Sequence, residues 1–485
     1  MRNIIHITKG LVPLWDEYLT DTRFTTATLS VNKARKEGVV MTLDRPWETA
    51  AGTFVTIMRD EDKYRMYYQV WKGYPDGDEG LDVCYAESTD GINWERPNLG
   101  LHEFEGSYEN NLLLTGICDN FFVMKDENPN CPPEHRYKAI LEGGFVKDNP
   151  GNQPSKKLVC MTSADGIHFE KHSIVSTGYG YDSQNTLHWN PYTKKYYCYF
   201  REVRDRGFDT NPEWNEKKVR GIRVMESADF VNWSDPVSLD YMGEEDYPMY
   251  TNCISAYPYD TRYYIGFPTR YVERKEWNKN YDRLCGGEWR RERYGQNKRY
   301  ALAVTDCVFM SSRDNKSWYR FDEATVEIGP EVYTNWVYGS CYLASGGVLE
   351  TPSRFEGEPN ELSVYVRDRK HDDPMAGVIT RHTYRMDGFA SYKASYKRKI
   401  FRTKVFTFEG NTLSMNFKTS ARGSIYVSVL DENGMAIDGY TTCELFGDSV
   451  NRIIDFDKPL SELQGRAISL SFAMSDAEIF SLRFS

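Results

Sequence analysis

One short motif recurs along most of the chain and divides it into units of similar length. It reads STDGINW at 88–94, SADGIHF at 163–169, SADFVNW at 227–233 and SRDNKSW at 312–318, with a weaker copy, RMDGFASY, from residue 385. Successive copies begin 75, 64, 85 and 73 residues apart. Such units are longer than most solenoid repeats, so each must contain several strands or helices besides the motif.

Each copy follows two strand-like runs, and a further extended run stands before those. In the first unit the runs are TFVTIMRD, YRMYYQV and DVCYAE, and the segment after the motif, ERPNLGL, can supply a fourth strand. Aromatic residues, which favour strands, make up 14% of the chain. Four strands per unit, repeated around a channel, are typical of a β-propeller blade. The five units therefore predict an all-β chain with a five-bladed β-propeller.

The Asp-Gly step of the motif fits a turn between two strands. Asp can fold its side chain back onto the backbone, Gly tolerates a positive φ, and the aromatic residue that follows can pack between sheets. We therefore interpret S-x-D-G-x-x-W as structural rather than catalytic.

The end of the chain breaks the repeat. Residues 405–440 alternate apolar and polar side chains and turn at Asn433-Gly434, and the strand-like runs AISLSFAM and IFSLRF follow. Regular short strands without another blade motif predict a β-sandwich. We expect a catalytic propeller over residues 1–395 and an accessory β-sandwich over residues 396–485. The polar segment 273–300 is the longest candidate loop, as a lid, an oligomer contact or a solvated insertion.

Charge and hydropathy exclude several partners. The net charge of −11 disfavours nucleic acid and anionic membrane surfaces. No run approaches the roughly 18 apolar residues of a membrane span, and the first residues, MRNIIHITKGLVPLWDEYL, lack the apolar core of a secretion signal. We expect a cytoplasmic protein, or a periplasmic or secreted one if a signal peptide once preceded this sequence; the oligomeric state stays open.

Cysteine and histidine patterns give no sign of a metal or cofactor. The ten Cys include no C-x-x-C pair, so we expect buried, reduced thiols. The eight His show neither H-x-H nor HExxH spacing. Asp76, Asp78 and Asp82 lack the EF-hand pattern, so we favour an acidic turn over the alternative of a calcium site. We expect no metal and no cofactor.

Side chains just before the first strand of each unit can face a common funnel in a propeller. The five segments are DRPWETAAG, GICDNFF, YGYDSQNTLHW, PMYTNCIS and VYTNWVYGS. Units one to three offer carboxylates, namely Asp44, Glu48, Asp119 and Asp182. The candidate substrate-binding residues are Trp47, Asn185, Arg223, Tyr250, Asn252, Arg270, Asn335 and Trp336.

Carboxylates from successive blades suit cleavage of a glycosidic bond. One carboxyl group protonates the leaving oxygen, another attacks or activates water, and a third stabilises the oxocarbenium-like transition state. The same acids could instead cap turns. We predict that Glu48, Asp119 and Asp182 form the catalytic set. Asp306 and Asp368 are alternatives for the third acid.

Three arginines could orient a substrate. Arg201 beside Glu202, Arg223 and Arg270 could bind a carboxylate, a phosphate or hydroxyl groups through bidentate contacts. Ion pairing at strand edges is the alternative.

The five-unit plan with a C-terminal sandwich resembles the glycoside hydrolase superfamily of five-bladed propellers that includes invertases, inulinases, levansucrases and arabinanases. The architectural likeness spans nearly the whole chain. More closely, DRPWE, YRMYYQ, CYAESTDGINWERPNLGL, DSQN, YTN, FPTRY, FMSSRD and the tail from TSARGSIYVSVLDENGMAIDGY to IFSLRF are similar to a group of bacterial proteins labelled as glycosidases or invertase-like proteins.

The resemblance implies roles for three acids. Glu48 falls closest to the invertase nucleophile, which begins the first strand of blade one. Asp119 stands where that family has its transition-state stabiliser, and Asp182 where it has its acid. The chain departs from the family in lacking the WMNDPNG, RDP and EC motifs, and Glu and Asp are exchanged at two positions.

Three functions are consistent with these patterns. The first is a hydrolase that cleaves a glycosidic bond in an oligosaccharide, with furanosides among its candidate substrates. The second is a glycoside phosphorylase, in which phosphate replaces water beside Arg201, Arg223 and Arg270. The third is a carbohydrate-binding propeller without catalysis. A sialidase fits less well, because its turns read S-x-D-x-G-x-x-W and its propeller has six blades.

Overall fold

The structure is a computed structural model that describes residues 4–48, 54–71, 81–117, 120–143, 157–175, 181–205, 218–244, 247–284, 286–326, 341–369 and 376–485. The chain forms two compact units. Unit 1 comprises the chain up to Ala34 with Ser353–Leu362 and Tyr384–Ser485, and unit 2 comprises Arg35–Pro352 and Ser363–Thr383.

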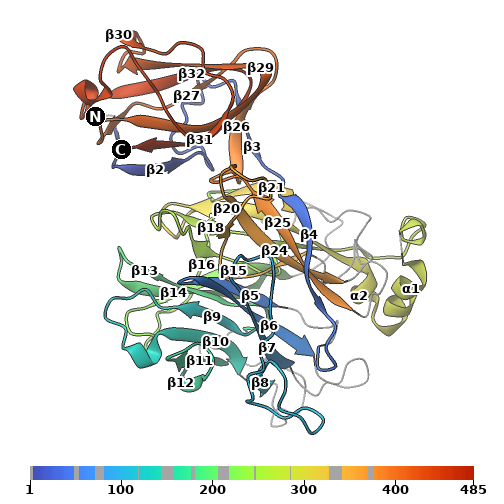
Figure 1. The fold of residues 1–485 in the computed structure, drawn as a ribbon. Helices are drawn as coiled ribbons and strands as arrows, with labels where there is room; N and C mark the ends of the chain where they lie inside the picture. Colours follow the sequence, from blue (N-terminus) through green and yellow to red (C-terminus); the bar gives the residue numbers. More distant parts are fainter. Residues whose placement is uncertain are drawn as a thin grey trace. The chain divides into compact units, whose positions relative to one another are not determined.

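Unit 2 is a five-bladed β-propeller, which confirms the fold class expected from the repeats (Figure 1). Blade I contains β5 (Val55–Asp60), β6 (Lys63–Trp71), β7 (Leu81–Ser88) and β8 (Leu112–Ile117). Blade II contains β9 (Phe122–Lys125), β10 (Tyr137–Gly143), β11 (Lys157–Ser163) and β12 (Glu170–Val175), with a short 3₁₀ helix, η1 (Pro133–His135), before β10. Blade III contains β13 (Thr186–Asn190), β14 (Lys195–Asp205), β15 (Lys218–Ser227) and β16 (Val237–Ser238).

The other two blades have five strands each. Blade IV contains β17 (Ser255–Ala256), β18 (Tyr264–Gly266), β19 (Thr269–Glu273), β20 (Ala303–Ser312) and β21 (Trp318–Val326). Blade V contains β22 (Tyr342–Leu343), β23 (Leu349–Thr351), β24 (Glu361–Arg369), β25 (Gly377–Tyr384) and β4 (Arg35–Leu43). β18 and β19 both pair with β20, and β22 and β23 both pair with β24.

The fifth blade takes its last strand from the beginning of the chain. β25 pairs with β4, from Gly377 opposite Leu43 to Thr383 opposite Arg35, so a blue strand lies beside an orange one in Figure 1. The expectation that the segment after each motif supplies the fourth strand is wrong for this blade, because pairing between the two ends of the repeat region closes the ring. It is also wrong for ERPNLGL in blade I, whose fourth strand is β8.

The repeated motif forms the turn after the strand that is third in the order of each sheet, namely β7, β11, β15 or β20. In blade I the Ser88 hydroxyl accepts hydrogen bonds from the backbone N–H groups of Asp90 and Gly91, at 3.2 and 2.9 Å. The Asp90 carboxylate accepts from those of Ile92 and Asn93, at 2.8 Å each. The residue after the Asp has a positive φ in four copies: Gly91 (71°), Gly166 (76°), Phe230 (63°) and Asn315 (67°). The structural interpretation of the motif is therefore confirmed in these turns.

The fifth copy departs from this geometry. There the Asp387 residue itself has a positive φ of 54°, and its carboxylate accepts a hydrogen bond from the Ser481 hydroxyl at 2.8 Å. Both residues belong to unit 1. The copy therefore marks the end of the propeller rather than a fifth blade turn.

The turn in blade I predicts an acid-sensitive contribution to stability. Burial acts to raise the pKa of Asp90, but hydrogen bonds from the backbone N–H groups of Asn93 and Ile92 outweigh it and lower the pKa to about 2 from 3.8. Because the folded-state pKa is lowered, this stabilisation is complete above the unfolded-state pKa and disappears as the pH falls through the folded-state pKa. We expect Asp90→Asn to lower the free energy of unfolding by about 1 kcal/mol at neutral pH and by less at a pH of about 2.5. Thermal unfolding of the wild type and the variant at both pH values checks this. An equal loss of stability at both would contradict it.

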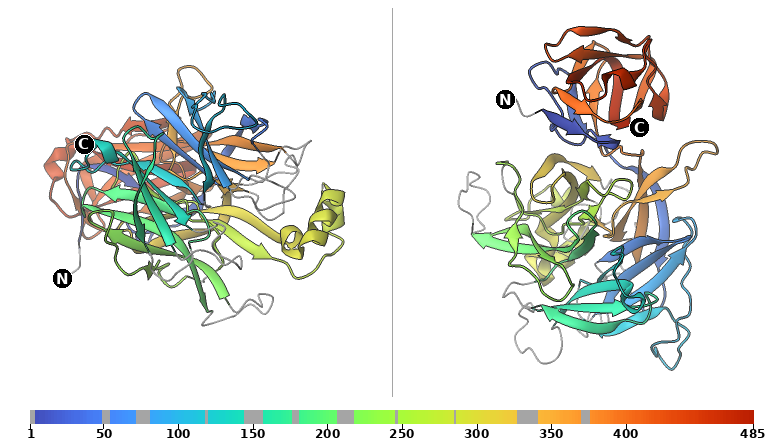
Figure 2. Two further views of the ribbon diagram at one scale, coloured as in Figure 1. Left: turned by 90° about the horizontal axis from the view of Figure 1, so that it is seen from below. Right: turned by 90° about the vertical axis from the view of Figure 1, so that its left-hand side faces the viewer.

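Unit 1 contains one continuous set of paired strands drawn from both ends of the chain. They are β1 (Ile5–Ile7), β2 (Gly10–Pro13), β3 (Thr28–Val31), β26 (Ala390–Ala394), β27 (Lys399–Arg402), β28 (Phe406–Phe408), β29 (Leu413–Asp431), β30 (Ala436–Thr441), β31 (Asp448–Ile453) and β32 (Ile468–Phe484), with a 3₁₀ helix, η3 (Leu460–Leu463). β1 pairs in parallel with β28, and β2 and β3 pair antiparallel with β32 and β26. Blue strands accordingly lie among the red ones in Figure 2.

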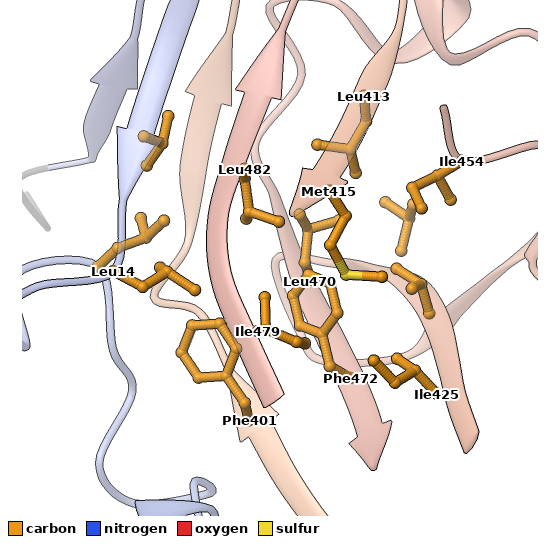
Figure 3. Close-up of a cluster of buried hydrophobic side chains, with 14 of the residues drawn as sticks. Leu14, Phe401, Leu413, Met415, Ile425, Ile454, Leu470, Phe472, Ile479 and Leu482 are labelled. Carbon is orange, nitrogen blue, oxygen red and sulfur yellow. The ribbon is translucent and has the colours of Figure 1, made fainter. Parts of the chain in front are cut away.

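The first strands of the chain therefore lie in unit 1, whereas the sequence assigned residues 1–395 to the propeller. These strands belong to unit 1 because they pair with strands near the end of the chain and share a hydrophobic core with them. Leu14 is buried with Phe401, Leu470 and Phe472 in a cluster that extends along β29 and β32 (Figure 3).

The polar insertion 273–300 is largely helical rather than a loop. It holds η2 (Tyr281–Arg283), α1 (Gly287–Gln296) and most of α2 (Lys298–Leu302). Trp277 stacks on Tyr281 with ring centroids 5.0 Å apart and meets the edge of Tyr294 at 5.3 Å. These rings give the segment a small core of its own, which its charged sequence does not show. In Figure 1 and in the left-hand view of Figure 2 the helices project from the edge of unit 2.

Most described cysteines are buried and free of disulfides. The buried ones are Cys84, Cys160, Cys198, Cys253, Cys307 and Cys341, whereas Cys131 is partly exposed and Cys443 exposed. Cys118 and Cys285 lie outside the described residues. Among the helices that the structure describes, none has the length and apolar character of a membrane span.

Candidate active site

The innermost strands of the blades all begin at one end of the propeller. We call this end, where β5, β9, β13, β17 and β22 start, the strand-start end. Just inside it, the Gln184 side chain donates to the carbonyl oxygen of Val55 at 3.3 Å and accepts from the Ser345 hydroxyl at 2.8 Å. The Ser345 N–H donates to the same carbonyl at 2.8 Å. These buried contacts join blades I, III and V, so side chains fill the channel at this level.

Asp182 is a partly exposed carboxylate at the strand-start end of blade III. Its side chain is 42% exposed, and it accepts a hydrogen bond from Nη1 of Arg201 at 2.7 Å. The Arg201 guanidinium is itself buried, at 8% exposure, and lies 4.4 Å from the ring centroid of Tyr250 in blade IV. The sequence thus identified three residues that the structure brings together, with the carboxylate facing solvent and the guanidinium behind it.

Four aromatic rings support this arrangement. Tyr250 stacks on Tyr342, with centroids 5.5 Å apart and planes at 6°, and on Tyr271 at 5.8 Å. Phe54, which precedes β5, stacks on Tyr342 at 5.6 Å. All four rings are buried. Because both neighbours and Arg201 cover its ring, Tyr250 is placed to hold Arg201 in position rather than to stack on a substrate.

Two further guanidinium–carboxylate pairs occupy blades III and IV. Nε and Nη2 of Arg223 both lie 3.0 Å from an oxygen of Glu202. Arg270 makes a bidentate pair with Asp306, at 2.7 and 2.5 Å. Arg223 and Arg270, expected to bind substrate, are thus each engaged with a carboxylate in this structure.

Glu48 is enclosed, although the sequence placed it as a candidate nucleophile. Its side chain is 0% exposed. One carboxylate oxygen accepts from the backbone N–H groups of Asp44 and Arg45, at 3.0 and 3.1 Å, and from Arg96 at 2.8 Å. The other accepts from the Tyr68 hydroxyl. Burial raises the pKa of Glu48, and the hydrogen bond from Tyr68 and the charge of Arg96 oppose that rise.

Trp47 belongs to the same enclosed cluster. Its indole N–H donates to the side-chain oxygen of Asn111 at 2.7 Å, and its ring meets the edge of Phe104 at 5.6 Å. The Asn111 amide donates to the Tyr68 hydroxyl at 2.7 Å. These contacts explain how residues 44–48 are held as a turn.

Two of the predicted asparagines donate hydrogen bonds to backbone carbonyl oxygens. Asn185 is fully buried and donates to the carbonyl oxygen of Tyr181 at 3.1 Å. Asn252 accepts from the Thr186 hydroxyl at 2.7 Å and donates to the carbonyl oxygen of Gln184 at 3.1 Å. Both residues position the segment that precedes β13.

Other predicted positions divide into two groups. Asp119, Asn335, Trp336, Asp76 and Asp78 lie outside the described residues. Asp368 is buried and accepts from the N–H of Arg369 at 2.8 Å, and Asp82 accepts from the N–H of Gly116 at 2.8 Å.

Glu142 is a carboxylate that the sequence pattern before the first strands does not indicate. It lies near the end of β10 and is fully buried. Asn120 connects it to blade III, because its amide nitrogen lies 3.2 Å from a Glu142 oxygen and 3.1 Å from the carbonyl oxygen of Tyr181. Tyr181 directly precedes Asp182. The signal was an acid closing the apolar run YKAILEGG, at the end of a second strand rather than before a first one.

No protein-family model and no curated protein sequence matches the chain. Several of the solved structures that it resembles are described as glycoside hydrolases. An exo-β-1,3-galactanase from Phanerochaete chrysosporium is 9% identical, with 93% of this chain and 100% of that one covered and a TM-score of 0.39. A thermostable family-43 glycoside hydrolase is 15% identical, with 72% and 95% covered and a TM-score of 0.40. A structure described under the GH130 family of mannoside phosphorylases, which contains glycoside hydrolases that target β-1,2 mannosidic linkages in Candida mannan, is 13% identical, with 79% and 99% covered and a TM-score of 0.45.

These neighbours are of the enzyme class that the sequence resembles. At such identities and scores, the likeness carries no statement about substrate or reaction.

Proposed function

We propose that the chain is a glycoside hydrolase that cleaves a glycosidic bond in an oligosaccharide at the strand-start end of the propeller. The observation that carries this proposal is the pair of carboxyl groups on neighbouring blades, Asp182 and Glu142, joined through Asn120 and Tyr181. One is partly exposed beside a guanidinium and the other is enclosed. Asp182 is the member open to a substrate for the acid or base step of glycoside cleavage. The enclosed Glu142 acts on it indirectly, through Asn120 and Tyr181.

In this proposal Asp182 is the carboxylate that exchanges a proton with the substrate, because it is the exposed member of the pair. Arg201 fixes the carboxylate, and Tyr250 fixes Arg201. Asp119 and Glu48 stay candidates for the other acids of the catalytic set. The contacts of Glu48 favour a structural role in the turn at 44–48.

Hydrolysis is favoured over phosphorolysis by the charges at this end. A phosphate site needs cationic groups that are free to bind it. Arg201, Arg223 and Arg270 each bind a carboxylate instead, so phosphate would have to break an ion pair. We therefore propose water, and not phosphate, as the acceptor.

Two finer features belong to the same proposal. A furanoside in a short oligosaccharide is the substrate that the resemblance to invertases and arabinanases favours. Unit 1 is proposed to be an accessory β-sandwich, which is supported by the pairing of its two long strands, β29 and β32, over a continuous apolar core.

An assay against a panel of furanosides, pyranosides and short oligosaccharides tests the function. We expect release of reducing sugar from at least one of them, at a rate that added phosphate does not increase. Turnover that requires phosphate would support the phosphorylase instead. Binding of a sugar without turnover would support the non-catalytic propeller.

A further inference from the structure

A cavity lies along the innermost strands of the blades and extends beyond their ends. Its volume is about 690 Å³, and residues from all five blades line it, along or beyond β5, β9, β13, β17 and β22. We call it the strand-end pocket. The buried layer around Gln184 lies nearer the starts of the same strands. None of the residues described in the candidate active site lines this pocket.

We propose that the strand-end pocket binds an uncharged saccharide of one or two sugar units, at a site separate from the catalytic one. This inference does not depend on the proposed function, because it concerns binding at the other end of the strands. Its volume falls within the range of small-molecule sites, about 300–1,000 Å³.

An anchored aromatic ring gives the pocket a platform for a sugar face. Tyr259 lines the wall and is half-buried. Its hydroxyl donates to Glu350, another wall residue, at 2.7 Å. The ring is therefore held before a ligand arrives, so binding costs little conformational entropy.

The wall also contains polar groups without a partner. Within the part of the chain that the structure describes, the ring nitrogens of His188, the indole N–H of Trp189 and the Ser255 hydroxyl have no hydrogen-bond partner. His188 is 7% exposed and packs against Tyr264, with ring centroids 5.1 Å apart. A buried group without a partner costs roughly 1–3 kcal/mol. These atoms have almost no exposed surface, so sugar hydroxyls, which both donate and accept, relieve this cost only when the wall moves to uncover them.

His188 stays uncharged at neutral pH. Burial lowers its pKa to about 3. Its ring therefore offers one donor and one acceptor rather than a positive charge. This matches a neutral hydroxyl-bearing ligand better than an anion.

Two cations of the wall, Lys125 and Arg136, are paired with carboxylates. Nε of a third, Arg59, donates to the carbonyl oxygen of Glu61 at 3.3 Å. Lys125 lies 3.1 Å from Glu61 and 2.6 Å from Asp60. Arg136 lies 3.1 Å from the same Glu61 carboxylate. An anionic ligand would have to compete with these carboxylates, whereas an uncharged saccharide leaves the pairs intact.

Calorimetric titration of the full chain with glucose, galactose, mannose, arabinose, xylose, sucrose and lactose tests the proposal. Two variants act on different parts of the wall: Tyr259→Ala removes the ring, and Thr261→Trp fills the pocket. Thr261→Val is the matched control for Thr261→Trp, and Tyr259→Phe keeps the ring but removes the hydroxyl that anchors it to Glu350. We expect at least one sugar to bind the wild type and to bind each test variant about tenfold more weakly or worse, with Thr261→Val within about twofold and Tyr259→Phe between the wild type and Tyr259→Ala.

Three results would overturn the proposal. They are no binding by any of the seven sugars, sugar binding that both test variants leave unchanged, and binding of inorganic phosphate alone. Thermal unfolding of each variant shows whether it is folded, and the second variant decides if the first is not. Activity in the oligosaccharide assay should persist in Thr261→Trp, which separates this site from the catalytic one.

Discussion

Asp182→Asn is expected to lower kcat by about 10²–10⁴-fold, because general acid–base catalysis contributes that much and an amide cannot exchange the proton. The Asp182 side chain is 42% exposed, so the fold should tolerate the change, with some loss of stability because the buried Arg201 guanidinium loses this counter-charge. The substitution keeps an oxygen that can accept from Arg201. Steady-state kinetics on the best substrate of the panel, together with the midpoint of thermal unfolding, measure both effects. A kcat within about threefold of the wild type would contradict the assignment.

Glu48→Gln is the matched comparison for this prediction. Loss of the charge leaves Arg96 beside an enclosed amide, with the exposed Asp44 carboxylate, 2.9 Å away, as its remaining counter-charge. The cost approaches, without reaching, the value of about 3–5 kcal/mol for a broken buried pair. We therefore expect a lower midpoint of unfolding with kcat close to that of the wild type. A large loss of kcat in a variant that unfolds at the same midpoint as the wild type would contradict this. Such a result would support the role of nucleophile that the resemblance implies for Glu48.

Gly346→Ala is expected to lower the free energy of unfolding of the propeller by about 3–5 kcal/mol, which places it among the most damaging single substitutions. Gly346 has a φ of +104°, and a Cβ there would lie 2.1 Å from the carbonyl oxygen of Ile57. The clash is with backbone, so no side chain can move aside. The clash lies beside the contact between blades I and V, where the backbone carbonyl oxygen of Ser345 accepts from the N–H of Ile57 at 2.9 Å.

Gly106→Ala separates the clash from the cost of the backbone conformation. Gly106 also has a positive φ, +85°, but no heavy atom lies within 4 Å of the place its Cβ would take. Gly106→Ala should therefore lower the free energy of unfolding by only about 1–2 kcal/mol. Calorimetry of both variants, scored on the transition of the propeller, makes the comparison. Equal losses would show that blades I and V do not approach as closely as described.

The blades could be predicted because their signal is local. Ser88 and Asp90 bind backbone groups within three residues, so the turn repeats wherever its residues repeat. The closing strand β4 could not be predicted, since it pairs with β25 more than 300 residues later and no nearby residue specifies that partner. The same holds for β1, β2 and β3, whose partners lie near the other end of the chain.

The sequence indicated residues of the proposed site but not their surroundings. Asp182 and Tyr250 both stand just before a first strand, and every innermost strand starts at the same end. The sequence does not distinguish the exposed carboxylate of Asp182 from the enclosed one of Glu48, since only the fold places Tyr68 and Arg96 around the latter. Glu142 could not be predicted in this way, because it closes a second strand rather than preceding a first one.

The central claim is that water attacks a glycosidic bond at the strand-start end of the propeller. Mass spectrometry of the products formed in ¹⁸O-labelled water with phosphate present tests it most directly, using the oligosaccharides of the panel. We predict that one sugar product carries a single ¹⁸O atom and that no sugar phosphate forms. A sugar phosphate, or no cleavage of any oligosaccharide in the panel, would contradict the account.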